Sequence, residues 1–149
     1  MDYSKLVRQL FEVLSISYYG KPDLNFSEFF QGELKMLNYL SSNGSDNISP
    51  SDLCRNLYMT SARVAAALKS AERKGYVKRR ISDSDRRVVI VSLTEEGRRY
   101  AQQKKDGLSK KLYRLLEQLG EKDSAELIRI IRRLTEISGS RDTEGEDIL

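Results

Sequence analysis

The chain has 149 residues, enough for one domain with a hydrophobic core that needs neither disulfides nor metal ions. One cysteine, no histidine and no Gly-rich phosphate loop argue against a disulfide framework, a metal site, a cofactor and enzymatic acid–base or nucleophilic chemistry. No secretion signal and no apolar run long enough to span a bilayer are present, which predicts a cytoplasmic protein without membrane contact. The formal net charge is +4 and becomes +7 over residues 1–139, because residues 140–149 hold four acids and one Arg, so a polyanionic partner is expected.

Two amphipathic helices are predicted at the start of the chain. The first covers residues 2–19 and ends at the Gly-Lys-Pro-Asp run of residues 20–23. Its apolar face is too broad to remain exposed, so a partner for it is expected. The second runs from about Ser27 to Leu40, with a cap within residues 25–27 and a polar run after it.

A short helix, a turn and a second short helix follow. Ser49 is the expected cap of the first, with Pro50 in its first turn and with Leu53, Cys54 and Leu57 facing inward. The turn covers residues 58–60. The second helix begins at a Thr60 or Ser61 cap, carries a stripe of Val64, Leu68 and Ala71, and stops at Gly75, which suits the left-handed position past a helix end.

A β-hairpin with a polar tip is predicted next. Val77, Arg79 and Ile81 alternate with polar residues, and Val89, Val91 and Leu93 alternate with Val88, Ile90 and Ser92 after the turn. Eight Lys or Arg and three acids lie between residues 69 and 87. A helix followed by a cationic hairpin is typical of a winged helix-turn-helix, a mainly α fold with a small β-hairpin wing that binds double-stranded DNA.

The chain is expected to end in two long helices and an acidic tail. Residues 94–119 predict a helix about 39 Å long at the usual rise per residue, and residues 122–138 predict another with an apolar side. Together with residues 2–19 these helices are predicted to form a dimerisation region, and residues 27–93 a DNA-binding lobe, within one domain of residues 1–139. Residues 140–149 are predicted to be disordered. A two-fold dimer would present two reading helices to half-sites about one turn of duplex apart.

The hairpin also carries a family signature. Asp85, Arg87, Val91, Leu93 and Thr94 have the spacing D-x-R-x-x-x-V-x-L-T, followed by Glu-Glu-Gly, and this resembles the wing signature of the MarR family of bacterial transcription regulators. The run Gly-Tyr-Val at residues 75–77 is similar to that family's junction between recognition helix and wing, and the order of helices agrees over residues 3–138. The resemblance implies a homodimeric regulator, most often a repressor, that binds pseudo-palindromic operators.

The recognition helix supplies the first group of expected DNA-binding residues, on the side away from its apolar stripe: Thr60, Ser61, Ala62, Arg63, Ala65 and Ala66. Arg63 is the only long donor among them and is expected at a guanine edge or a phosphate, with a solvated surface charge as the alternative. Family members often have larger polar groups where this chain has alanine at 65–67, so thymine methyl contacts and DNA shape are expected to carry more of the readout.

The wing supplies the second group. Arg86 or Arg87 at its tip is expected to enter a narrow minor groove. The family resemblance favours Arg87, held by a charge-assisted hydrogen bond from Asp85. An ordinary exposed ion pair is the alternative for these two residues. Lys78 and Arg80 are expected to touch phosphates.

Cys54 and the aromatic residues leave alternatives open. Some family members sense oxidants through one thiol, but core packing is favoured for Cys54 because buried thiols are inert. The resemblance also implies a small aromatic or anionic effector between the dimerisation helices and the DNA-binding lobe, which would change the spacing of the recognition helices. That region would be lined by aromatics for which plain core packing is favoured: Tyr18, Tyr19, Phe26, Phe29, Phe30 and Tyr39. A winged-helix protein-interaction module and an RNA-binding protein are the alternative functions.

Overall fold

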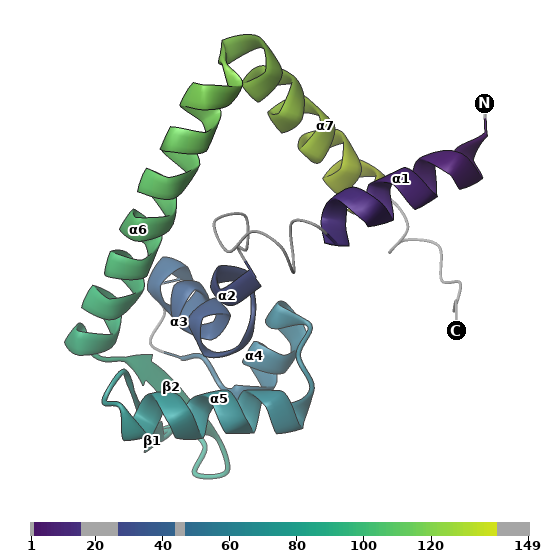
Figure 1. The fold of residues 1–149 in the computed structure, drawn as a ribbon. Helices are drawn as coiled ribbons and strands as arrows, with labels where there is room; N and C mark the ends of the chain where they lie inside the picture. The colour runs from purple at the N-terminus through teal and green to yellow at the C-terminus, as the bar shows by residue number, and fades with distance from the viewer. Residues whose placement is uncertain (1, 16–26, 44–46, 140–149) are drawn as a thin grey trace. The chain divides into compact units, whose positions relative to one another are not determined.

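The computed structural model describes residues 2–15, 27–43 and 47–139. The chain divides between Leu108 and Ser109 into two compact units, and the described residues of each are treated separately below. The elements, in chain order (Figure 1), are α1 Tyr3–Ser15, α2 Ser27–Phe30, α3 Gly32–Asn43, α4 Pro50–Leu57, α5 Ser61–Arg73, β1 Val77–Ile81, β2 Val89–Leu93, α6 Glu95–Leu119 and α7 Glu121–Gly139. The predicted mainly helical fold with a two-stranded hairpin is confirmed.

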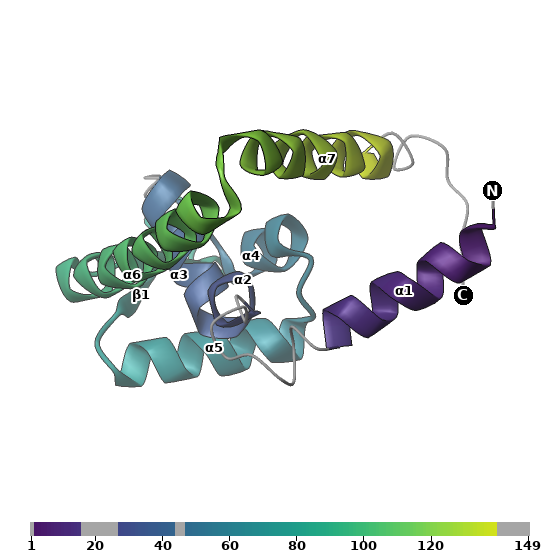
Figure 2. The ribbon, with the colours of Figure 1, turned by 45° about the horizontal axis from the view of Figure 1, so that its top comes forward.

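The core of the first unit lies among α3, α4, α5 and the base of the hairpin, with α5 packed across α3 and α4 (Figures 1 and 2). The largest fully buried side chains are Met36, Leu37, Leu53, Val64, Leu68 and Val91. Full burial of one such side chain contributes about 1.5–3 kcal/mol. Because two of them come from α5, this core fixes which side of that helix remains outside.

The single helix predicted from Ser27 to Leu40 is wrong, because the structure contains two. Gly32 has a φ of +57°, in the left-handed region that a glycine adopts without a Cβ penalty, and the chain bends there between α2 and α3. α3 then continues beyond the predicted end to Asn43. As a consequence Phe30, predicted on the apolar side of one helix, is exposed at the end of a one-turn helix.

The start of α4 agrees with the prediction. Ser49 Oγ accepts the backbone N–H of Asp52 at 3.2 Å, and a carboxylate oxygen of Asp52 accepts the backbone N–H of Ser49 at 2.9 Å. This reciprocal capping box, with Pro50 at the start of the helix, satisfies donors that have no partner within the helix.

The strands pair antiparallel, from Val77 opposite Leu93 to Ile81 opposite Val89. The simple alternation predicted for them is wrong in two places. Ile81 is 61% exposed, because the outer end of the hairpin extends beyond the core, whereas Ile90 and Val91 are both buried. Since neighbouring residues of a strand point to opposite faces, β2 is covered on both faces there. Val91 N–H also donates to Ile48 O at 2.8 Å, so residue 48 pairs with β2.

The hairpin is closed at its base by Gly75, Tyr76 and Thr94. Thr94 Oγ1 donates to Gly75 O at 2.5 Å, and Thr94 N–H donates to Tyr76 O at 3.0 Å. Gly75 has a φ of +78°, as expected for the residue past a helix end. Thr94 Oγ1 also accepts the N–H of Gly97 at 3.0 Å, which caps α6. The end of α5, the wing and the start of α6 therefore meet at one point.

The helices predicted for dimerisation leave their apolar sides exposed. Neither α1 nor α7 contains a buried residue. On α7 the exposed apolar side chains are Leu127, Ile128, Ile130, Ile131, Leu134 and Ile137, and on α1 they are Tyr3, Leu6, Val7, Leu10, Phe11, Val13 and Leu14. Residues 16–19 of the predicted first helix, the breaker at 20–23, the cap positions 25 and 26 and the predicted disordered tail lie outside the described residues. Within the described ranges, no helix has the length and apolar character needed to cross a membrane.

Candidate nucleic-acid interface

The outer side of α5 presents a row of short side chains around one arginine. Thr60 caps the helix, and its Oγ1 accepts the backbone N–H of Arg63 at 3.3 Å. All six residues predicted here are exposed: Thr60, Ser61, Ala62, Arg63, Ala65 and Ala66. Arg63 makes no ion pair with any residue of the described ranges, so its guanidinium is available to a ligand.

Ala67 was not among the expected DNA-binding residues, although it follows Ala65 and Ala66 in the run where family members often have larger polar groups. It is buried in the core cluster with Val64 and Leu68. A larger polar side chain at residue 67 would enter that core. Of the three alanines at 65–67, only Ala65 and Ala66 are therefore on the surface of α5 that can contact DNA bases.

The tip of the wing is organised around Asp85. Its Oδ1 accepts the backbone N–H of Arg87 at 3.0 Å and Arg87 Nε at 3.2 Å, and these bonds hold the pKa of the Asp85 carboxyl below its ordinary value. The predicted hydrogen bond between these two residues is thus present. The side chain of Arg87 is still 90% exposed, so the bond orients the guanidinium without covering it.

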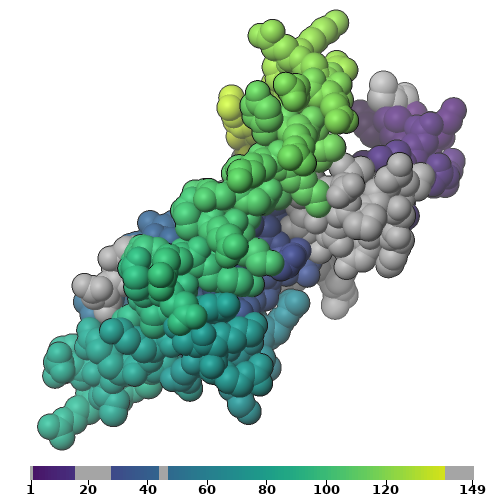
Figure 3. Space-filling view, turned by 60° about the vertical axis from the view of Figure 1, so that its left-hand side comes forward, coloured from purple at the N-terminus to yellow at the C-terminus, as the bar shows by residue number. Residues whose placement is uncertain are grey.

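The other predicted wing residues are exposed as well. Lys78 and Arg80 lie on β1, and Arg86 lies at the tip. Arg80 Nη1 is 3.8 Å from an oxygen of Asp83. In the space-filling view, the teal atoms of α5 and of the hairpin lie next to one another (Figure 3), and α5 contacts β1. The two groups predicted separately from sequence therefore come from neighbouring elements of the first unit.

Three contacts that position this surface were not predicted. Arg79 Nε donates to Glu72 Oε2 at 3.1 Å, which joins the wing to α5; this bond lowers the pKa of Glu72 and raises that of Arg79. Lys74 pairs with Glu33 of α3 at 3.0 Å. Lys35 Nζ donates to Leu57 O at 2.6 Å, at the end of α4. No local pattern identifies these pairs, because each depends on how the helices pack.

Cys54 packs against the core cluster and is only partly exposed, in agreement with the favoured interpretation. Its Sγ lies 4.0 Å from Ser61 Oγ, at the limit for a hydrogen bond.

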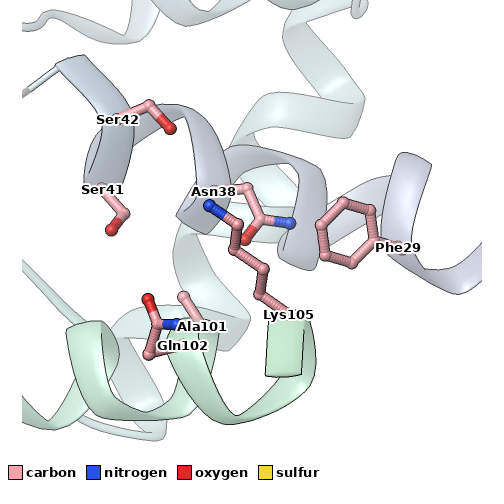
Figure 4. A pocket seen from close by; sticks show the side chains of 7 residues that line it. All are labelled: Phe29, Asn38, Ser41, Ser42, Ala101, Gln102 and Lys105. Atoms are coloured by element: carbon pink, nitrogen blue, oxygen red, sulfur yellow. The ribbon is translucent and has the colours of Figure 1, made fainter. Parts of the chain in front are cut away.

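A cavity of about 250 Å³ lies in the first unit between α3 and the beginning of α6. Figure 4 shows Asn38 of α3 and Lys105 of α6 pointing toward one another, with Ser41, Ser42, Gln102 and Phe29 around them. Asn38 Nδ2 is buried and has no hydrogen-bond partner among the described residues. Of the aromatics predicted near an effector, Phe29 lines this cavity, Tyr39 packs on the core, and Tyr18, Tyr19 and Phe26 lie outside the described residues.

Comparisons with known proteins agree with this geometry. Residues 31–88 match the model of the MarR family. The chain is 32% identical over 104 residues to the uncharacterized HTH-type transcriptional regulator YdgJ of Bacillus subtilis (strain 168), covering 70% of this chain and 62% of YdgJ. It is 26% identical over 106 residues to the HTH-type transcriptional repressor YetL of the same organism, covering 71% of this chain and 64% of YetL. The matches thus span less than two thirds of each relative. Both relatives are named as transcription regulators and not as enzymes, in line with the expectation from sequence.

Solved structures share the fold. Streptococcus pneumoniae FabT in complex with DNA superposes with a TM-score of 0.66 at 22% identity, covering 93% of this chain and 99% of FabT. The Staphylococcus aureus MepR–DNA complex gives a TM-score of 0.63 at 22% identity, covering 94% of this chain and 98% of MepR. By the family match of its residues 31–88, its two relatives and its winged helix-turn-helix, the chain is similar to the MarR family of transcription regulators.

Proposed function

We propose that this chain is a DNA-binding transcription regulator that works in the cytoplasm as a homodimer on pseudo-palindromic operators. The observation that carries the proposal is the exposure of both the outer side of α5 and the wing tip, with Arg63 and Arg87 accessible. An α-helix with one face free fits a major groove, and a cationic hairpin tip fits the adjoining minor groove.

Base readout on α5 is proposed to be sparse. Arg63 supplies a bidentate donor for a guanine edge or a phosphate, and Ala62, Ala65 and Ala66 offer methyl groups to thymine. Phosphate contacts come from Thr60, Ser61, Lys78 and Arg80. With few base-edge donors, selectivity depends on the width of the minor groove at Arg86 and Arg87.

The second copy of the chain is the proposed partner of α1 and α7. Each helix exposes a continuous apolar side of the kind that soluble monomers seldom leave uncovered. A self-complementary surface closed by a two-fold axis buries both copies of it at once. Repression is the proposed output, since YetL is a repressor by name.

The cavity between α3 and α6 is the proposed effector site. Asn38 Nδ2 is a buried donor at this cavity, so a ligand acceptor could bond to it. Lys105 and two serines at the same cavity favour an anionic group on a small ligand, with Phe29 beside it for an aromatic ring. Asn38→Leu should abolish release of DNA by such a ligand while leaving DNA binding itself intact.

The test of the proposed function is binding to duplexes selected by the purified chain from a randomised library. Binding is measured by fluorescence anisotropy over a salt series, with a scrambled duplex and a hairpin RNA as controls. For a regulator of this kind, two chains should bind each selected duplex, and the scrambled duplex should bind more weakly. The logarithm of the binding constant should fall with the logarithm of the salt concentration, with a slope of about −0.9 per phosphate contact. Equal binding to RNA would favour the RNA-binding alternative. A selection that enriches no duplex, with no binding to the scrambled duplex or the RNA, would favour a protein-interaction module.

A further inference from the structure

Tyr58, in the turn between α4 and α5, has a backbone conformation that suits a different residue type. Its φ is 52° and its ψ is 44°, and it is the only non-glycine residue with a positive φ in the described part of the chain. This left-handed conformation brings Cβ close to the following carbonyl oxygen, a conflict that glycine avoids and asparagine tolerates. The turn requires the conformation, because it directs the backbone N–H of Met59 back to Cys54 O at 3.1 Å, which closes the end of α4.

The side chain of Tyr58 contributes little to the stability of the fold. It is 88% exposed, between the buried side chains of Leu57 and Met59. It makes no hydrogen bond or ring contact with another described residue. A single exposed aromatic is ordinary on a protein surface, but an exposed aromatic that also carries a backbone penalty indicates a role outside the folded chain.

The position of Tyr58 indicates which role. Thr60, the cap of α5, is two residues further on, so the two Cα atoms are at most about 7 Å apart. Lys35 Nζ, bonded to Leu57 O at 2.6 Å, anchors the turn on the preceding residue. Tyr58 therefore places an exposed phenol beside the N-terminal end of α5, where the proposed DNA contacts of that helix begin.

We propose that Tyr58 is a DNA-contacting residue, whose ring packs on a deoxyribose and whose hydroxyl donates to a phosphate oxygen at the edge of the major groove. The inference rests on the proposed function. A tyrosine is suited to this place because its ring is apolar and its tip is a neutral donor. Because the phenol carries no charge, its contact releases no counterion and leaves the salt dependence of binding unchanged.

The experiment compares four variants of the full chain by thermal unfolding and by affinity for a selected and a scrambled duplex. Tyr58→Gly and Tyr58→Asn remove the side chain and suit the turn, so the Tm should rise by about 2–4 °C while both duplexes bind roughly tenfold or more weakly. Tyr58→Phe should keep the wild-type Tm and lose about fivefold in affinity for both duplexes. Tyr113→Phe removes the hydroxyl of another exposed tyrosine, on α6, and should change neither quantity.

The test separates the explanations because Tm is expected to rise while the affinity for DNA falls. Unchanged affinity in Tyr58→Gly and Tyr58→Asn would overturn the inference and leave the proposed function standing, since the wild-type chain would still bind. A Tm that falls in both variants would assign the side chain to the fold instead, and a reduced salt slope in Tyr58→Phe would exclude a neutral phosphate contact. If the wild-type chain enriched no duplex from the library, or bound the selected and the scrambled duplex equally, the proposed function itself would fail.

Discussion

At the residue scale, Gly97 allows the start of α6 to approach the backbone of Tyr76 more closely than any residue with a Cβ would. A Cβ built on it would lie 2.1 Å from Tyr76 O and 2.8 Å from Tyr76 C, both backbone atoms that cannot move aside. We expect Gly97→Ala to lower the free energy of unfolding by about 3 kcal/mol or more, because the end of α5, the wing and α6 meet at this point. Urea denaturation followed by circular dichroism measures the effect.

Gly107 provides the matched control on the same helix. A Cβ there would meet no atom within 4 Å. Gly107→Ala should therefore raise the stability by roughly 0.5–1 kcal/mol, as alanine does inside an exposed helix. Equal effects of the two substitutions would mean that helix propensity, and not the close approach of Gly97 to Tyr76, decides the outcome.

Arg87 is the residue for which the proposed minor-groove contact is most directly tested. Its guanidinium is held by Asp85 yet 90% exposed, so Arg87→Ala should cost little stability. We expect the affinity for a selected duplex to fall by at least about tenfold and the logarithmic salt slope to decrease by about one. Arg133→Ala on α7 removes the same charge elsewhere and serves as the control; an unchanged affinity in Arg87→Ala would refute the role.

At the element scale, the capping box of α4 makes stability depend on pH. The hydrogen bond from the backbone N–H of Ser49, and then that from its hydroxyl, lower the pKa of Asp52 below its ordinary value. A carboxyl with a depressed folded-state pKa stabilises the fold above its unfolded-state pKa, and this contribution is lost as pH falls through the folded-state value. Asp52→Ala should cost about 0.5–1 kcal/mol at pH 7, and the difference from wild type should shrink below about pH 4.

Urea unfolding at a series of pH values tests this expectation. Asp83→Ala removes a fully exposed carboxylate and should follow the wild type throughout. A cost of Asp52→Ala that stays constant down to pH 3 would show that its ionised form is not what stabilises the cap.

The elements also show what sequence could predict and what it could not. Ser49, Thr60, Gly75 and Thr94 act through neighbours in the chain, so the starts of α4, α5 and α6 and the end of α5 were predictable. The break at Gly32 was missed because an isolated glycine in a helical pattern is often tolerated. Packing between separate elements decides whether Ile90 and Ala67 are buried and whether Arg79 meets Glu72. The local pattern of apolar residues does not reveal that packing.

At the scale of the whole molecule, the apolar sides of α1 and α7 predict that the working form has two chains. Leu134→Glu places a charge within the apolar side of α7, where the wild-type side chain is more than half exposed. We expect this variant to stay folded, to have the mass of one chain in analytical ultracentrifugation, and to lose most of its affinity for a two-half-site duplex. Arg132→Gln, on the charged side of α7, should remain dimeric. A wild-type chain that is folded and monomeric at micromolar concentration would contradict the dimer.

The bonds from Thr94 to Gly75 and Tyr76 make the intervening hairpin a closed loop whose two ends are fastened to each other. The segment from Ser82 to Val88 is likewise joined across its own base, by the bond from Ser82 N–H to Val88 O at 2.9 Å. A longer, shorter or foreign tip grafted between these two residues would leave the anchor of the loop untouched. A change in the DNA contacts proposed for this tip therefore needs only the exchange of a few residues between 82 and 88, while the rest of the first unit stays as it is.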